Sequence, residues 1–223
     1  MKNSRKTNIQ YWFTVDGDTE GWYLDHIQRL INNSDDSKYT IKIEHKKYKS
    51  PKKYAKNISP CLTPKVTHLC DIESTSQEHL SNFSKVLSEL QSAKKDKGIK
   101  YDIGYSNYTF DLWIVLHKKQ LTAHLSDRFD YLTHINSSYS KDFQSMDEYK
   151  ERDNFHTILD CINLETVKCA IKNAEKIEKL NEENGANSKS EYGVKYYLDN
   201  PSLSIHKAIK QILIDCNIIK KKK

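Results

Sequence analysis

Residues 11–20, YWFTVDGDTE, set the fold class expected for this chain. The first half of the stretch is a short apolar run of aromatic and β-branched residues, which is typical of a buried strand. The turn at residues 16–19 ends this strand, and Asp18 or Thr19 is the expected N-cap of a helix. That helix would place one set of apolar side chains on a single face, namely Tyr23, Ile27, Leu30 and Ile31. The stretch therefore predicts a strand, an acidic turn and an amphipathic helix in direct succession.

Three further strands are expected in the first half of the chain. Residues 39–44 alternate between apolar and polar, residues 66–70 form an apolar run, and residues 100–105 again have a strand-like pattern. An amphipathic helix that ends near Lys97 separates the last two strands, with Gly98 as its expected C-cap. Strands that alternate with helices indicate a parallel sheet covered by helices, so the predicted fold class is α/β.

The second half of the sequence indicates mostly helices. Residues 110–116 are strongly apolar and fit either a strand or a buried helix, whereas residues 136–154 are polar and loop-like. Apolar residues keep helical spacing from Phe155 to about Leu180, and the polar stretch at residues 182–190 is expected to be flexible. A last helix is expected to begin after residues 200–202.

These patterns divide the chain into a core and an appended part. We predict an α/β core over residues 8–106, a mainly helical region over residues 107–217 packed on that core, and a basic tail over residues 218–223. A chain of 223 residues is long enough to bury a substantial core of this kind.

Composition excludes several classes of protein. The sequence contains no apolar run near the 18–20 residues of a membrane span and no apolar signal core after its charged start. Its five cysteines are an odd number with wide spacing, so no disulfide framework is expected and the cytoplasm is the expected location. The net charge of +6 permits nucleic-acid binding without requiring it.

Acidic residues follow two of the predicted strands. Asp16, Asp18 and Glu20 follow the first strand, and Asp71 and Glu73 follow the strand at residues 66–70. If these strands are neighbours, their acids converge at one edge of the sheet, where ligands bind in open α/β folds. Carboxylate oxygens suit Mg²⁺ or Mn²⁺, which can activate water and stabilise a phosphoryl displacement. Ordinary turn and cap chemistry is the alternative interpretation of both clusters.

Five other residues are candidates for the site. Ser106 and Asn107 lie between a strand and an apolar run, where they would either contact phosphate or cap a helix. Asp111 lies within that apolar run, and a buried acid needs a partner or a metal. His117 is either catalytic or an interior histidine with satisfied hydrogen bonds. Lys141 would either stabilise charge on a phosphate or lie on the surface.

A basic tract covers residues 42–56, which contain seven lysines and one glutamate, with Tyr48 and Tyr54 interleaved. One interpretation is a nucleic-acid interface with stacking tyrosines, and the other is a solvated surface loop. The lysines assigned to the interface are Lys46, Lys47, Lys49, Lys52 and Lys53.

Taken together, the motifs resemble the RloB-like family of phage-defence proteins, which have the Toprim fold and include the Toprim component of the AbiL abortive-infection system. The resemblance rests on residues 15–20 (VDGDTE) with Tyr23, similar to V-E-G-x-T-E…Y; residues 71–73 (DIE), in the place of D-x-D; residues 106–117 (SNYTFDLWIVLH), similar to S-N-P-x-F-E-L-W-x-x-x-H; residues 139–141 (YSK), similar to Y-x-K; and residues 200–202 (NPS). Asp16 stands where the family has Glu, Glu73 where it has Asp, and Tyr108 where it has Pro.

The resemblance implies a metal-dependent nuclease that serves as the toxin of an abortive-infection system. Asp16, Glu20, Asp71 and Glu73 would then be catalytic residues that hold Mg²⁺ or Mn²⁺, while Asp111, His117 and Lys141 would complete the catalytic set. The substrate would be tRNA, other RNA or DNA. The implied partner is an ABC/SMC-like ATPase.

Two other functions remain open from the sequence. The chain would be a non-catalytic component that docks on such an ATPase, or a nucleic-acid binder that uses the lysine tract. No membrane association is expected. The oligomeric state, including a homo-oligomer, is left open.

Overall fold

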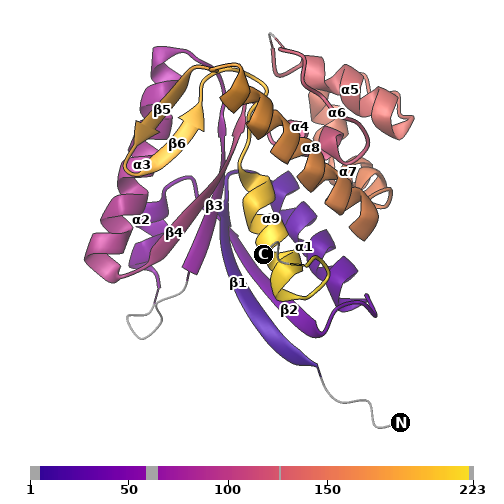
Figure 1. Cartoon of the computed structure of the whole chain (residues 1–223), viewed down its shortest axis with the longest axis horizontal. Coiled ribbons are helices and arrows are strands. Elements are labelled where there is room, and N and C mark those ends of the chain that lie inside the picture. The colour runs from indigo at the N-terminus through magenta and orange to yellow at the C-terminus, as the bar shows by residue number, and fades with distance from the viewer. Residues whose placement is uncertain (1–5, 59–64, 126, 221–223) are drawn as a thin grey trace.

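The computed structural model describes residues 6–58, 65–125 and 127–220, and a four-stranded parallel sheet lies at its centre (Figure 1). The strands are β1 (Thr7–Val15), β2 (Tyr39–Lys47), β3 (Lys65–Ile72) and β4 (Lys100–Asn107), in the spatial order β2-β1-β3-β4. Each neighbouring pair is parallel. All four strands expected from the sequence are present, and each extends beyond its predicted bounds.

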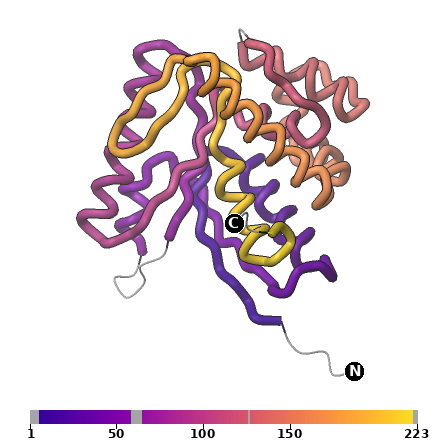
Figure 2. The backbone as a smooth tube through the Cα atoms, in the orientation of Figure 1, coloured from indigo at the N-terminus to yellow at the C-terminus, as the bar shows by residue number. Residues whose placement is uncertain are grey.

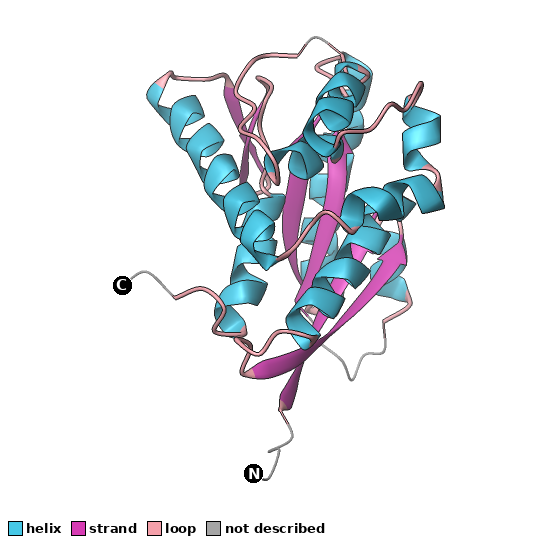
Figure 3. Cartoon of the chain, turned by 90° about the vertical axis from the view of Figure 1, so that its right-hand side faces the viewer, coloured by secondary structure: helices cyan, strands magenta, loops and turns pink. Residues whose placement is uncertain are grey.

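Helices cover both faces of this sheet, which explains why residues 66–70 of its inner strand β3 are buried on both sides. Helix α1 (Asp18–Asn32) and the last helix, α9 (Ile205–Asp215), pack on one face, and α2 (Pro51–Lys56) and α3 (Gln77–Lys97) pack on the other (Figures 1 and 3). The first face buries Phe13 and Ile41 among α1 and α9, whereas the second buries Ile72 against Phe83 and Leu87 of α3.

The ends of the two long core helices follow the sequence only in part. Ser76 caps α3 and accepts the N–H of His79, and Gly98 ends this helix with φ 68°. The prediction of Asp18 or Thr19 as the cap of α1 is wrong, because Gly17 is the N-cap and contributes no side chain. Asp18 instead forms an ion pair with Lys47 at 2.8 Å.

Before α9, the C-terminal part contains five helices and a hairpin in the described residues. They are α4 (Asp111–Leu116), α5 (Asp130–Tyr139), α6 (Met146–Lys150), α7 (Arg152–Leu159), α8 (Leu164–Glu183) and the antiparallel pair β5 (Ser188–Glu191) and β6 (Val194–Tyr197). They precede α9, which completes the C-terminal part.

Three expectations for this part need correction. The apolar run at residues 110–116 forms a helix, and the supposed loop at residues 136–154 contains α6 and parts of α5 and α7. The single helix expected from Phe155 to Leu180 is two helices, because Asn163 forms a capping box with Thr166 and starts α8. The hairpin begins inside the polar stretch that was expected to be flexible.

The C-terminal part packs directly on the core and is continuous with it. Trp113 of α4, Tyr131 of α5 and Ile171 of α8 belong to the same buried cluster as Phe13 of the sheet. The chain then returns to the sheet, so that α9 lies beside β4 (Figure 2). Tyr11 of β1 donates a hydrogen bond to Asp215 at the end of α9 at 2.9 Å. The predicted α/β fold, a parallel sheet flanked by helices with a mainly helical C-terminal part, is thus confirmed.

None of the helices in the described residues combines the length and apolar character required to cross a bilayer.

Candidate active site

The strand order brings the two acidic clusters together. From β1 the chain passes to β2 on one side, and β3 then pairs with β1 on the other side. This is the switch point at which a crevice opens beyond the carboxyl ends of parallel strands. Asp16 follows β1, and Asp71 lies near the end of β3. Together with Glu20 and Glu73, they line one cavity of about 320 Å³.

Glu20 reaches this cavity because the first turn of α1 folds closely around it. The side chain is buried, and Thr19 Oγ1 donates a hydrogen bond to Glu20 Oε2 at 2.9 Å. A Cβ atom at position 17 would lie only 2.7 Å from Glu20 Oε2, so Gly17 leaves the space that this carboxylate occupies. The glycine of the acidic turn is therefore required by the position of Glu20.

A fifth carboxylate, Asp111, joins the site from the first residue of α4. It is fully buried, and its Oδ2 atom accepts a hydrogen bond from Thr109 Oγ1 at 2.6 Å. Lys150 Nζ at the end of α6 lies 3.0 Å from the same oxygen. The sequence did not identify Lys150, because it lies in a stretch expected to be a loop and only tertiary packing brings it to the acids.

The carboxylates disfavour one another's ionisation. Burial, with added repulsion from Glu20 and Glu73, raises the pKa of Asp16 to about 7, although Lys49 opposes the shift. Burial also raises the pKa of Glu20. The pKa of Asp71 lies well above its ordinary value because of burial and the charge of Glu20. Burial would lower the pKa of Lys150, but the carboxylates, led by Asp111, outweigh burial and raise it.

His68, in the middle of β3, is a second residue that sequence reasoning missed. It is fully buried, its Nδ1 atom lies 2.8 Å from Thr14 Oγ1, and its Nε2 atom lies 3.9 Å from Asp16 Oδ1. Burial lowers the pKa of His68 to about 4, so the ring is neutral at physiological pH. In the tautomer that carries its proton on Nε2, Thr14 donates to Nδ1 and the N–H of His68 faces Asp16.

Cationic side chains surround the acids. Three cavities of about 320, 300 and 170 Å³ meet at Asp71 and Glu73, which line all of them. Lys49 lines the two larger cavities, whereas Lys150 lines the first and the third. Arg128 also lines the third, and its Nη1 atom lies 3.8 Å from Glu73 Oε2. An anionic polymer that reaches the acids would therefore meet positive charge on several sides.

Two aromatic residues, Tyr108 and Phe129, line the smallest cavity beside the acids. Phe129 is 58% exposed, which is unusual for a large apolar side chain, and Arg128 lies over its ring at 5.2 Å from the centroid. Tyr108 has φ 64°, a left-handed conformation that is rare for a bulky residue and is found where function imposes strain. Both rings offer flat surfaces next to the carboxylates.

The donor set fits a hard divalent cation in its chemistry. Asp16 Oδ1 and Asp111 Oδ1 are buried oxygen atoms without a hydrogen-bond partner among the described residues. Burial, with added repulsion between the acids, raises the pKa values of Asp16, Glu20 and Asp71, and a cation relieves such repulsion. No three His, Cys, Asp or Glu side chains of residues 6–58, 65–125 and 127–220 form a ready-made group of ligands. Small movements of the carboxylates would therefore accompany cation binding.

His117 and Lys141 lie apart from this cluster. His117 is buried in the core, with Nε2 3.1 Å from the Tyr23 hydroxyl and Nδ1 2.8 Å from the Trp113 carbonyl. This is the interior histidine with satisfied hydrogen bonds that the sequence left as an alternative. Lys141 follows the left-handed residue Ser140 that ends α5. The cavities that meet at the acids are lined instead by Lys47, Lys49, Lys85 and Lys150.

Ser106 and Asn107 have a structural role that neither sequence interpretation foresaw. Both are buried at the end of β4, and α4 begins after Phe110 without a side-chain cap. Asn107 Nδ2 donates to the carbonyls of Tyr197 and Asp199, each at 2.9 Å, and to that of Leu198 at 3.2 Å. Ser106 forms a bridge with Leu203. The pair therefore holds the segment that contains residues 200–202 against the sheet edge.

The basic tract divides between elements. Lys46 and Lys47 end β2, Lys49 follows it, and Lys52 and Lys53 lie exposed on α2. Tyr54 is buried and packs on Tyr48 with the ring centroids 5.3 Å apart, so it is unavailable as a stacking platform. The end of the tract nearest the acids is Lys47 and Lys49.

Comparisons with known proteins identify the family. The model of the family described as RloB-like protein matches residues 11–212, from β1 into α9. No curated protein and no solved structure matches the chain. The matched range includes all five carboxylates and Lys150. The chain belongs to the RloB-like family.

Proposed function

We propose that this chain is a divalent-metal-dependent nuclease that cleaves phosphodiester bonds of RNA, including tRNA, or of DNA. The observation that carries the proposal is the convergence of five carboxylates at the switch point between β1 and β3, with lysine and arginine around them. Acids alone would repel a polyanion, and lysines alone would only bind it. The combination is what metal-assisted phosphoryl transfer requires.

The acids would hold the cation, Mg²⁺ or Mn²⁺. Asp16, Glu20, Asp71 and Glu73 offer carboxylate oxygens in one cavity, and Asp111 lies beside them. A bound divalent cation would supply Lewis-acid stabilisation of the phosphoryl oxygens and would favour ionisation of water. The Nε2 atom of neutral His68 lies 3.9 Å from Asp16 Oδ1, on one side of the carboxylate. A bound cation would contact the carboxylate from another side.

The cationic and aromatic side chains would hold the polymer. Lys49 and Arg128 lie on different sides of Asp71 and Glu73, so a phosphate chain that passes over the acids can contact both. Lys150 lies close enough to Asp111 to stabilise charge on a phosphate at the acids. Phe129 would stack on an unpaired base, an interaction that is tolerant of sequence.

The family resemblance extends the proposal to the cellular role. The nuclease would act as the toxin of an anti-phage abortive-infection system, in the cytoplasm, with an ABC/SMC-like ATPase that controls it. Affinity purification of the tagged chain with the ATPase expressed from the same source tests the partner. A complex that forms in the Asp71→Asn variant as well as in the wild type is the expected result.

The nuclease itself is tested by cleavage. Purified protein is incubated with Mg²⁺ or Mn²⁺ and a panel of tRNA, other RNA and plasmid DNA, beside a Glu20→Gln/Asp71→Asn variant. Cleavage by the wild type alone is expected and names the polymer. Equal cleavage by both proteins would sink the assignment of these acids.

One observation favours a second candidate, a non-catalytic docking component. The Lys150 ammonium group already forms an ion pair within the cluster, and the described residues contain no ready-made ligand group. If the Lys150 ammonium group balances the acids permanently, the protein needs no metal at this site. A melting temperature that stays constant across millimolar Mg²⁺ and Mn²⁺ would support this candidate against the nuclease.

A further inference from the structure

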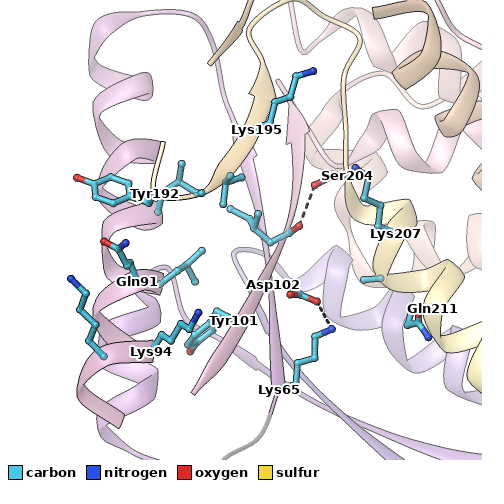
Figure 4. Close-up of a pocket in the computed structure, with 17 residues that line it drawn as sticks. Lys65, Gln91, Lys94, Tyr101, Asp102, Tyr192, Lys195, Ser204, Lys207 and Gln211 are labelled. Atoms are coloured by element: carbon cyan, nitrogen blue, oxygen red, sulfur yellow. Dashed lines mark hydrogen bonds and ion pairs between the residues drawn. The ribbon is translucent and has the colours of Figure 1, made fainter. Parts of the chain in front are cut away.

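We propose that a groove along the outer edge of β4 binds an extended acidic segment of a partner protein, which adds to the sheet as a fifth strand. The groove has a volume of about 860 Å³. It lies between α3 and α9, and the β5–β6 hairpin closes its upper end (Figure 4). This surface is separate from the acids, because it adjoins the first half of β4, whereas the acids lie beyond the carboxyl ends of the strands.

The chain itself already pairs with the second half of this edge. Tyr105 N–H donates to Ser204 Oγ at 3.0 Å, and the Tyr105 carbonyl accepts from Ser204 N–H at 2.8 Å. Asn107 N–H donates to the Ser202 carbonyl at 2.8 Å. The segment at residues 202–204 therefore acts as a short added strand, after which α9 turns away. The edge of β4 can thus accept an extended chain, because it does so in this molecule.

The first half of the edge remains open. Backbone groups of alternate residues point to the same side of a strand, so Tyr101 and Ile103 direct their amides outward as Tyr105 does. On the side of β4 that faces away from β3, the described residues provide no backbone hydrogen-bond partner for the Tyr101 amide, the Tyr101 carbonyl or the Ile103 amide. Among the residues that the structure describes, the Ile103 carbonyl accepts a hydrogen bond only from the Ser204 hydroxyl, at 3.2 Å (Figure 4). Lys100 and Asp102 are exposed, whereas residues 104–107 are buried.

Side chains around the open edge define what the added strand should contain. Leu87, Leu90, Ile103 and Val194 give the groove an apolar floor. Its polar wall carries Lys65, Lys94, Lys95, Lys195 and Lys207 against one acid, Asp102. Lys207 already pairs with Glu178 at 2.6 Å, so Lys94, Lys95 and Lys195 supply the positive charge for an acidic segment. Asp102 is neutralised by Lys65 at 2.6 Å (Figure 4). In a strand of alternating apolar and acidic residues, the apolar side chains would pack on the apolar floor of the groove. The acidic side chains, on the opposite face of the strand, would form ion pairs with the lysines.

The same features argue against other occupants. The β4 edge of a second copy would bring the same lysines against these lysines. The C-terminal residues 220–223 are all lysine, so this segment would be repelled as well. A nucleic-acid strand would satisfy the lysines, but the outward carbonyl of Tyr101 would face phosphate. Main-chain donors and acceptors in alternation are complementary to another peptide backbone.

Fluorescence polarisation with a labelled peptide of alternating Glu and Val tests the proposal. We expect saturable binding to the full chain and a loss of at least about tenfold when alternate peptide amides are N-methylated, since methylation removes main-chain donors. A peptide of alternating Lys and Val should not bind. Equal affinity for the methylated peptide would overturn strand addition.

Two variants locate the binding on the protein. Lys94→Glu/Lys95→Glu should weaken binding of the acidic peptide at least about tenfold. Lys97→Glu, on the same helix but outside the groove, should leave the affinity unchanged. Tyr101→Pro removes an outward N–H together with the Tyr101 side chain, whose hydroxyl donates to the Pro51 carbonyl. It should therefore weaken peptide binding more than a matched Tyr101→Ala variant, with melting temperatures showing that both variants still fold.

Three outcomes would overturn the proposal. Tighter binding of a labelled oligonucleotide, lost in the Lys94→Glu/Lys95→Glu variant, would assign the groove to nucleic acid. A concentration-dependent dimer that Tyr101→Pro abolishes would assign it to a second copy. Absence of peptide binding, together with self-association of a Lys94→Ser/Lys95→Ser variant, would show that the lysines only protect an exposed edge.

Discussion

Lys150 Nζ lies 3.0 Å from Asp111 Oδ2, which joins a helix of the C-terminal part to the acidic edge of the sheet. Asp111 is fully buried, whereas the Lys150 side chain is 40% exposed. The ion pair therefore neutralises a group that has no access to solvent. It also means that the site is assembled from both parts of the chain.

Replacing Lys150 by Met should lower stability and activity together. The buried Asp111 carboxylate would lose its cation, and breaking such a pair from one side costs about 1–3 kcal/mol at a half-exposed site. We expect a fall in melting temperature at neutral pH and loss of nucleic-acid cleavage. Lys141→Met is the matched comparison, since the family resemblance implied a catalytic role for Lys141. A larger loss of activity in Lys141→Met than in Lys150→Met would contradict the site described here.

Asp16 should make stability depend on pH. Its pKa in the folded chain, about 7, exceeds its ordinary value of 3.8. Protonated Asp16 therefore stabilises the fold below about pH 4, and this contribution is lost as the pH rises through 7. Asp16→Asn removes the ionisation, so its melting temperature should exceed that of the wild type by roughly 5 °C near pH 8 and by much less near pH 4.

Thermal denaturation in metal-free buffer at both pH values measures this difference. Asp18→Asn serves as the control, because Asp18 is exposed and paired with Lys47 outside the cluster of buried acids. If Asp16→Asn raised the melting temperature more near pH 4 than near pH 8, the pH dependence would have the opposite sign. That result would refute the raised pKa of Asp16 as its cause.

Asn107→Leu should destabilise the fold without involving substrate. The substitution keeps the volume but leaves three carbonyls of residues 197–199 without their donor. Among these bonds, the one to the Tyr197 carbonyl is buried, and a buried group that loses its partner costs about 1–3 kcal/mol. We expect a lower urea midpoint in the absence of nucleic acid. An unchanged midpoint with weakened nucleic-acid binding would instead support the phosphate-contact interpretation.

Phe129→Ser should weaken binding of single-stranded nucleic acid. Stacking of a base on an aromatic ring contributes about 1–3 kcal/mol, so affinity should fall about 5- to 100-fold. The measurement is polarisation of a labelled oligonucleotide in an Asp71→Asn background, where cleavage is not expected. Tyr192→Ser is the control, because Tyr192 is also an exposed aromatic residue but lies on the distant hairpin. Equal losses in both variants would remove Phe129 from the site.

The sheet and most of the acids could be predicted because they depend on local sequence. Residues 11–15 and 66–70 are apolar and β-branched, which predicts strands, and Asp16 and Asp71 follow them directly. What could not be predicted depends on contacts distant in sequence. Lys150 lies 39 positions after Asp111, and its neighbours give no sign of an active site. The donation from Asn107 to residues 197–199 likewise requires a fold that returns to β4.

The spacing of apolar residues also failed to predict a helix boundary, because polar side chains cap a helix end without interrupting that spacing. Apolar residues keep helical spacing through residues 155–180, yet Asn163 and Thr166 cap each other and divide the helix. The lone histidine that the sequence singled out, His117, lies in the core, whereas His68 faces Asp16 from inside a strand. A histidine within an apolar strand carries no mark that distinguishes these two situations.

Isothermal titration calorimetry of Mn²⁺ into the metal-free protein near pH 8 tests the central claim, that the acids at the switch point hold a divalent cation. We predict saturable binding by the wild type that is lost in Asp71→Asn, while Asp102→Asn, an acid on the far half of β4, binds as the wild type does. Binding that is equal in the wild type and in Asp71→Asn, or absent from all three proteins, would contradict the metal-dependent nuclease.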